Sequence, residues 1–134
     1  TKHDFRSLYF YCIQASNFNI HFLGKKCGEE LVKELNNHAC MIVPSIYHEA
    51  FGIVALEGLA CGCQCIVSDG DGLQEAVGDC GILFKKGDIK DMANKMLLAE
   101  NNDTINHKSI TKHLELFTPL EIGRQYVNYF KSLK

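Results

Sequence analysis

The sequence lacks any long run of lysine or arginine, any apolar stretch near the ~20 residues that cross a bilayer, and any repeat or proline-rich linker. Its net charge of -2 gives no electrostatic footprint for a nucleic acid. With 134 residues, 46% of them hydrophobic, and a mean hydropathy of -0.08, the composition is typical of one soluble globular domain. The chain opens at Thr1 in amphipathic sequence without a signal-peptide pattern, and we expect it to be a fragment.

The seven cysteines allow a metal or disulfide interpretation, which their surroundings argue against. The C-x-C-x-C run at residues 61–65 resembles a metal-binding loop, but no second cluster with ligand spacing accompanies it. Cys12, Cys40 and Cys65 each lie in an apolar segment, which favours buried, reduced thiols. We therefore expect no metal site.

Hydrophobic periodicity predicts alternating helices and strands. Helical spacing of apolar residues predicts helices at 5–13, 29–35, 52–61, 88–100, 104–116 and 119–133. Apolar runs predict strands at 19–23, 39–43, 65–67 and 82–84. A glycine-rich loop is expected at 68–72. This alternation predicts an α/β fold with a doubly wound parallel sheet, in which ligands bind at the carboxyl ends of the strands. The loops at 24–26, 44–52 and 68–75 would then converge on one edge.

Two carboxylates, Glu49 and Glu57, bracket the start of the helix predicted at 52–61. This helix follows directly on the strand at 39–43, and Gly52 stands at its beginning. The first N–H groups of a helix have no internal partner and can bind an anion, while carboxylates can bind hydroxyl groups. The segment therefore predicts a pocket for a phosphorylated and hydroxylated ligand, such as a nucleotide or a nucleotide-sugar.

A wider pattern of residues resembles the C-terminal domain of retaining, two-domain, Rossmann-like glycosyltransferases, which include sucrose synthase and glycogen synthase. The pattern consists of Phe22-Leu23-Gly24, Pro44-Ser45, Glu49-x-Phe51-Gly52, Glu57, Ala60-Cys61-Gly62, Ser68-Asp69, Gly72-x-x-Glu75 and Gly81-Ile82-Leu83. The E-x(7)-E signature of these enzymes matches Glu49 and Glu57. The resemblance covers nearly the whole chain and implies that residues 1–134 form a nucleotide-sugar-binding domain, with the first strands and an N-terminal acceptor domain absent.

The resemblance also implies roles for single residues. Glu49 would lie beside the donor sugar as the catalytic carboxylate, and Glu57 would bind the ribose hydroxyls. The backbone N–H groups facing the diphosphate would be those of Phe51, Gly52, Ile53 and Val54. Gly24 and Lys25 would lie near the nucleobase, and Asp71 and Gly72 close to the sugar.

Each role has a structural alternative. Glu57 could be a solvated helix residue, although Val54, Leu56 and Leu59 predict a largely buried segment. Glu49 could complement the helix dipole.

Other residues near the motif are expected to have structural roles. Phe51 could pack its ring in the loop, His48 is expected to be a polar edge residue, and Lys85 and Lys86 a solvated turn.

The chain also departs from the family pattern. Gln64 and Gln74 stand where proline is usual, and Asp71 stands where the first of two glycines is common. The basic pair that usually neutralises the diphosphate is not in this sequence.

The function implied is transfer of a hexose from a UDP-, GDP- or ADP-linked sugar to an acceptor hydroxyl, with retention of anomeric configuration. The acceptor would be a saccharide or lipid bound by the absent domain, and no cofactor, metal or nucleic acid is expected. The alternative is a non-catalytic Rossmann-like nucleotide-binding module; a nucleotide-sugar epimerase lacks the Phe-Gly-x-x-x-x-Glu neighbourhood. A cytoplasmic location is expected, with peripheral contact at the inner membrane face as a further option.

Overall fold

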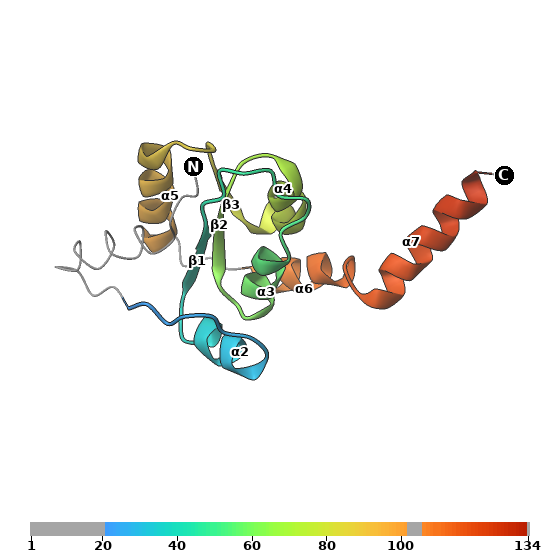
Figure 1. Cartoon of the computed structure of the whole chain (residues 1–134), viewed down its shortest axis with the longest axis horizontal. Helices are drawn as coiled ribbons and strands as arrows, with labels where there is room; N and C mark the ends of the chain where they lie inside the picture. Colours follow the sequence, from blue (N-terminus) through green and yellow to red (C-terminus); the bar gives the residue numbers. More distant parts are fainter. Residues whose placement is uncertain (1–20, 102–105, 134) are drawn as a thin grey trace, which may run out of the picture.

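The computed structural model describes residues 21–101 and 106–133 and contains one parallel sheet (Figure 1). The sheet order is β1-β2-β3, with bounds Cys40–Val43, Gln64–Ser68 and Ile82–Phe84. Val43 pairs with Val67, and Ser68 pairs with Phe84, so the carboxyl ends of all three strands lie at one edge. The central strand is apolar because both of its faces are covered, and Cys65, Ile66 and Val67 are fully buried.

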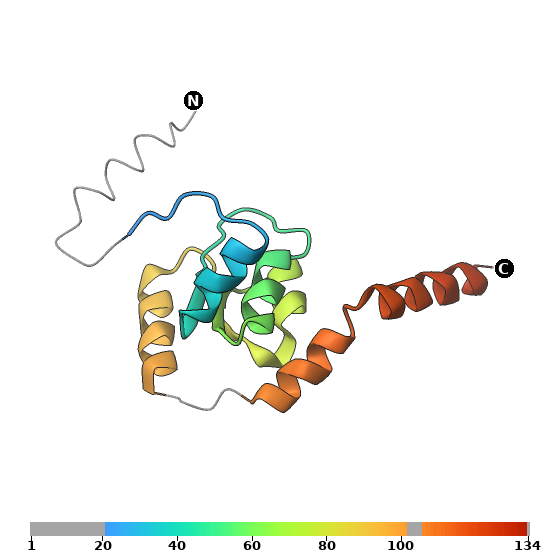
Figure 2. The ribbon, with the colours of Figure 1, turned by 90° about the horizontal axis from the view of Figure 1, so that it is seen from below.

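Helices cover both faces of this sheet. α3 (Ile53–Ala60) and α4 (Asp71–Val77) lie on one face, and α5 (Ile89–Asn101) lies on the other (Figures 1 and 2). Ala55 and Leu59 of α3 and Leu73 and Val77 of α4 pack with alternate residues of β2 to form the core. The α/β fold with a parallel, Rossmann-like sheet is thus confirmed.

The remaining elements surround this unit. α2 (Glu29–Asn36) precedes β1, and a short 3-10 turn (Gly78–Cys80) follows α4. α6 (His107–Glu115) adds Ile110 to the core, whereas α7 (Pro119–Ser132) extends away from the sheet (Figure 2). α7 begins where the sequence predicts, because Thr118 caps its first turn and Pro119 occupies the first position.

Two predicted elements differ from the structure. Residues 21–23 form no strand, so the strand predicted at 19–23 is wrong where it is described; residues 19–20 and the helix predicted at 5–13 lie outside the described residues. The loop predicted at 68–72 is shorter, because Gly70 ends it and α4 begins at Asp71. In the described part of the chain, none of the helices has the length and apolar character that a membrane span requires.

Candidate functional site

Three loops meet at the carboxyl edge of the sheet, and hydrogen bonds join them. The loop after β1 is joined to β2 by the Ser68 hydroxyl, which donates to the Ser45 carbonyl at 2.8 Å. The loop after β2 is joined to β3 by the Asp69 N–H, which donates to the Phe84 carbonyl at 2.7 Å. Ser68 is fully buried, so this bond also satisfies a polar group in the core.

Glu49 is half-buried and fixed at both its side chain and its backbone. The Ser45 hydroxyl donates to Glu49 Oε1 at 3.0 Å, and the Gly72 N–H donates to the Glu49 carbonyl at 2.9 Å. Glu49 lies four residues before α3, whose N-cap residue is Gly52, so it is not a first-turn residue of that helix. This placement disfavours the helix-dipole alternative and leaves a positioned carboxylate in front of the helix.

The start of α3 is open because no side chain caps it. Gly52 is the N-cap with φ 99° and ψ 48°, a left-handed conformation that favours glycine. A Cβ at Gly52 would lie 2.7 Å from Leu73 Cδ2, and a Cβ at Gly72 would overlap the backbone of Phe51. The starts of α3 and α4 therefore pack closely, and the first N–H groups of α3, including those of Ile53 and Val54, have no partner within the helix.

The Phe51 side chain packs away from this opening. Its ring lies 5.4 Å from that of Phe117, which in turn lies 5.1 Å from the His113 ring. His113 Nε2–H donates to the Ala76 carbonyl at 2.8 Å, since a carbonyl can only accept. The expectation that the Phe51 ring packs within the structure is thus correct, and only the backbone of Phe51 remains at the carboxyl edge.

Glu57 lies on the exposed face of α3, which corrects the expectation of a largely buried segment. Ala55 and Leu59 face the core, but Ile53 and Val54 are 65% and 45% exposed and share a face with Glu57. The reason is that only one side of the helix contacts the sheet. Glu57 lies about 6 Å along the axis from Ile53, and its carboxylate makes no hydrogen bond or ion pair with the described residues.

Asp71 and Lys86, which stand 15 residues apart in the sequence, form an ion pair. Lys86 Nζ lies 2.6 Å from Asp71 Oδ2 and 3.5 Å from the Tyr47 carbonyl, and His48 Nδ1 lies 2.9 Å from Asp71 Oδ1. Hydrogen bonds from Lys86 and His48 hold the pKa of the Asp71 carboxyl below its usual range. Lys86 lies in the predicted turn and its side chain is 30% exposed, but its ammonium group is held by Asp71; Lys85 in the same segment is exposed.

Gly24 and Lys25 are not brought to this edge. The segment at residues 21–28, to which both residues belong, leads into α2 beside the amino ends of the strands (Figure 1). The physical reason is that residues 21–23 form no strand that could carry this loop to the carboxyl edge. A contact of these two residues with the nucleobase stays a prediction.

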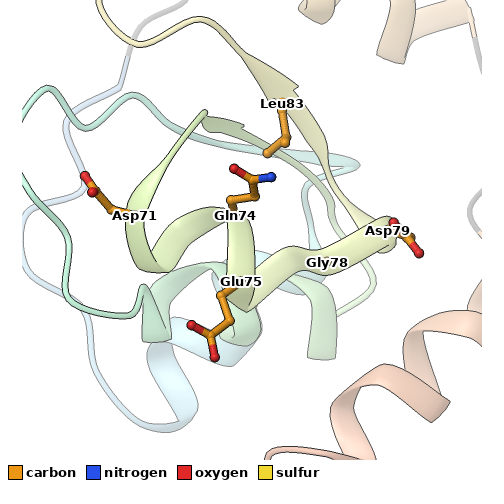
Figure 3. A pocket seen from close by; sticks show the side chains of 6 residues that line it. All are labelled: Asp71, Gln74, Glu75, Gly78, Asp79 and Leu83. Atoms are coloured by element: carbon orange, nitrogen blue, oxygen red, sulfur yellow. The ribbon is translucent and has the colours of Figure 1, made fainter.

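A surface depression of about 460 Å³ lies beside the edge without coinciding with it (Figure 3). Its lining residues come from α4, the 3-10 turn and β3: Asp71, Gln74, Glu75, Gly78, Asp79 and Leu83. It shares only Asp71 with the loops described above and does not reach the start of α3. We therefore locate the candidate site from the loops rather than from this depression.

Cys63 and Cys65 have a structural role in the core. Cys63 and Cys65 are fully buried, and their thiols donate to the carbonyls of Leu35, His38 and Ala55. Burial raises the pKa of Cys65 to about 12, so it stays a neutral thiol. Cys40 is exposed despite its apolar surroundings, because it stands at the start of β1, and Cys12 lies outside the described residues.

The chain is similar in sequence to known glycosyltransferases. The model of the family described as glycosyl transferases group 1 matches residues 11–114. An N,N'-diacetylbacillosaminyl-diphospho-undecaprenol alpha-1,3-N-acetylgalactosaminyltransferase of Campylobacter jejuni is 35% identical over 59% of this chain and 21% of its own length. A D-inositol 3-phosphate glycosyltransferase of Stackebrandtia nassauensis is 39% identical over 56% of this chain and 17% of its own length.

A third relative matches a longer part of the chain. The O-antigen chain mannosyltransferase B of Escherichia coli is 29% identical over 85% of this chain and 30% of its own length. The chain thus spans between 17% and 30% of these relatives. Because the family model covers most of the sequence, the chain belongs to the glycosyl transferases group 1 family.

Proposed function

We propose that this chain is the donor-binding part of a retaining glycosyltransferase, which transfers a hexose from a nucleoside-diphosphate sugar to an acceptor hydroxyl. The observation that carries the proposal is the placement of Glu49. Its carboxylate is held by Ser45 and its carbonyl by the Gly72 N–H, directly before the uncapped start of α3. A positioned acid beside an open helix start can bind a sugar and a phosphate side by side.

Each part of the donor has a counterpart at this edge. The N–H groups at the start of α3 bind the diphosphate, and the partial positive charge of the helix end stabilises it without a metal ion or cofactor. Glu57, further along the exposed face of α3, accepts hydrogen bonds from the ribose hydroxyls. Glu49 binds sugar hydroxyls and supports the positive charge that develops at the anomeric carbon.

Stabilisation of the departing diphosphate is the largest electrostatic contribution expected in such a transfer. The α3 N-terminus supplies part of it, and basic residues beyond this sequence supply the rest. We propose that this chain is the C-terminal domain and that the acceptor, a saccharide or a lipid, is bound by an N-terminal domain. The names of the relatives give different sugars and different acceptors, so we assign neither a sugar nor an acceptor to this chain.

Nucleotide sugars are cytosolic substrates, and the free thiols of the chain fit a reducing compartment. The proposed location is therefore the cytoplasm, with peripheral contact at the inner membrane face if the acceptor is a lipid.

Saturation-transfer NMR with UDP-, GDP- and ADP-sugars tests this function. We expect transfer to the ribose protons of one nucleotide, and its loss in Glu57→Ala, because a charge-assisted hydrogen bond of about 1.5–3 kcal/mol corresponds to about 10- to 100-fold in affinity. Glu100→Ala is the matched control, since Glu100 is an exposed glutamate on α5, at the opposite face of the sheet. Absence of transfer from all three nucleotides, or equal transfer in both variants, would contradict the proposal. Binding without turnover in the complete protein would instead favour the non-catalytic module.

A further inference from the structure

The carboxyl ends of all three strands contribute to one small polar cluster. The loop after β1 supplies His48 and the Tyr47 carbonyl, the loop after β2 leads to Asp71, and the turn after β3 supplies Lys86. The Lys86 N–H also donates to Asp69 Oδ1 at 2.6 Å, which fixes the backbone of the turn. The cluster is therefore positioned by the sheet itself and by both backbone and side-chain bonds.

Asp71 keeps hydrogen-bonding capacity after these contacts are made. A carboxylate can accept about four hydrogen bonds, and the described contacts use one on each oxygen. An ammonium group has three donors, and Lys86 directs one to Asp71 and one, at 3.5 Å, toward Tyr47. Their side chains are 27% and 30% exposed, so a free acceptor and a free donor lie side by side at the surface.

The backbone at Asp71 indicates that the side chain has a purpose there. Its φ of 55° makes it the non-glycine residue with positive φ in the described chain, a conformation that costs a side chain roughly 1 kcal/mol. Glycine would fit this backbone without strain, yet the residue present carries a carboxylate. An observed strained residue with free acceptors is a reason to look for a ligand group beside it.

The cluster also lies beside Glu49. Gly72, the residue after Asp71, donates its N–H to the Glu49 carbonyl, and His48 immediately precedes Glu49. Under the proposed function, Glu49 marks the sugar end of the donor. Adjacent hydroxyls of a sugar each donate and accept, so an acceptor and a donor held together match a pair of them.

We propose that Asp71 and Lys86, with His48 orienting the carboxylate, bind two neighbouring hydroxyls of the donor sugar and so determine which sugar is used. This inference rests on the proposed function. The ligand class is a neutral hexose with two adjacent free hydroxyl groups, and a donor lacking one of them binds more weakly. The nucleoside diphosphate alone does not reach the pair, and its affinity does not depend on it.

The test is a comparison of variants and donors by titration calorimetry on the complete protein. The ligands are the nucleotide-hexose that binds most tightly, its monodeoxy analogues, and the nucleoside diphosphate. Lys86→Met and Asp71→Gly each remove one member of the pair, and Asp71→Gly also relieves the positive φ, which keeps the fold. Lys85→Met is the matched control, because it removes the same charge one residue away from an exposed side chain.

We expect the wild-type protein to bind one deoxy analogue at least about 10-fold more weakly than the parent donor. The reason is that the missing sugar hydroxyl leaves Asp71 and Lys86 without a hydrogen-bond partner. Lys86→Met and Asp71→Gly should each lower the affinity for the parent donor by a similar factor. In these variants the difference in affinity between the parent donor and the deoxy analogue should shrink to about 3-fold or less. Lys85→Met should behave as wild type, and diphosphate affinity should stay within about 2-fold throughout.

Two outcomes overturn the inference while leaving the proposed function intact. One is an equal affinity of Lys86→Met and Lys85→Met for the parent donor. The other is an unchanged difference in affinity between the parent donor and the deoxy analogue in both Lys86→Met and Asp71→Gly. If wild-type protein binds neither the nucleoside diphosphates nor any nucleotide-hexose, the proposed function fails, and this inference fails with it.

Discussion

Replacing Gly72 by alanine would put a methyl group into the backbone of the loop that carries Glu49. The added Cβ would lie 2.5 Å from the carbonyl carbon of Ala50 and still closer to the N and Cα atoms of Phe51. These neighbours are backbone atoms, so no side-chain rotation can relieve the overlap. Either α4 or the loop before α3 must move, and the Gly72 N–H would lose its bond to the Glu49 carbonyl.

The size of the effect follows from two opposing contributions. Alanine in place of a helical glycine stabilises by about 1 kcal/mol, whereas overpacking a close contact costs about 1–3 kcal/mol and occasionally more. Since the contact is with backbone, we expect the upper end and a net loss of about 2 kcal/mol. For a chain of this size, that corresponds to a fall in Tm of about 6–8 °C.

Gly123→Ala is the matched control for thermal unfolding. Gly123 is also helical, in α7, but a Cβ there would meet nothing within 4 Å, so only the helix-propensity gain remains. We expect its Tm to rise by about 3 °C, while Gly72→Ala melts lower and binds donor more weakly. A Tm for Gly72→Ala equal to or above that of the wild type would refute the proposed packing between the starts of α3 and α4.

Three further predictions concern other parts of the chain. The raised pKa of Cys65 keeps its thiol protonated in the folded state, so the stabilisation it contributes is complete below about pH 9 and is lost as the pH rises toward about 12. In urea unfolding, the free energy of unfolding of Cys65→Ala should therefore fall less at alkaline pH than that of the wild type. Thr118→Ala removes the cap of α7 and should reduce helicity in circular dichroism, at a cost of about 1 kcal/mol; unchanged helicity would argue against the cap. Phe117→Ala removes the ring beside Phe51 and should lower the free energy of unfolding by about 2 kcal/mol; donor affinity should fall as well, and an unaffected affinity would separate this contact from the site.

The sheet and most helices could be predicted from the sequence because their signals are local. The apolar run at 39–43 and the spacing of residues at 29–35 depend only on neighbours along the chain, and both elements formed. The helix start at Ile53 was also local, since Gly52 precedes an apolar helical segment.

Features that depend on contacts distant in sequence could not be predicted. Lys86 meets Asp71 only because β2 and β3 are parallel neighbours, so their carboxyl ends lie together. Likewise, apolar residues stand on both sides of Glu57 in the sequence, and only the folded structure shows that Ala55 and Leu59 contact the sheet while Val54 is exposed. The start of α4 was missed because a glycine-rich segment with a positive-φ aspartate resembles a turn.

The proposed orientation of the donor is tested by comparing how Glu49 and Glu57 contribute to the affinity for two ligands. Affinities of the wild type, Glu49→Ala and Glu57→Ala should be measured for the preferred nucleoside diphosphate and for its hexose conjugate. We expect Glu57→Ala to lower the affinity for both ligands by a similar factor, about 10-fold or more, because Glu57 binds the ribose that they share. Glu49→Ala should weaken only the conjugate, since Glu49 binds the sugar. A loss of diphosphate affinity in Glu49→Ala with none in Glu57→Ala would contradict the proposed orientation of the donor.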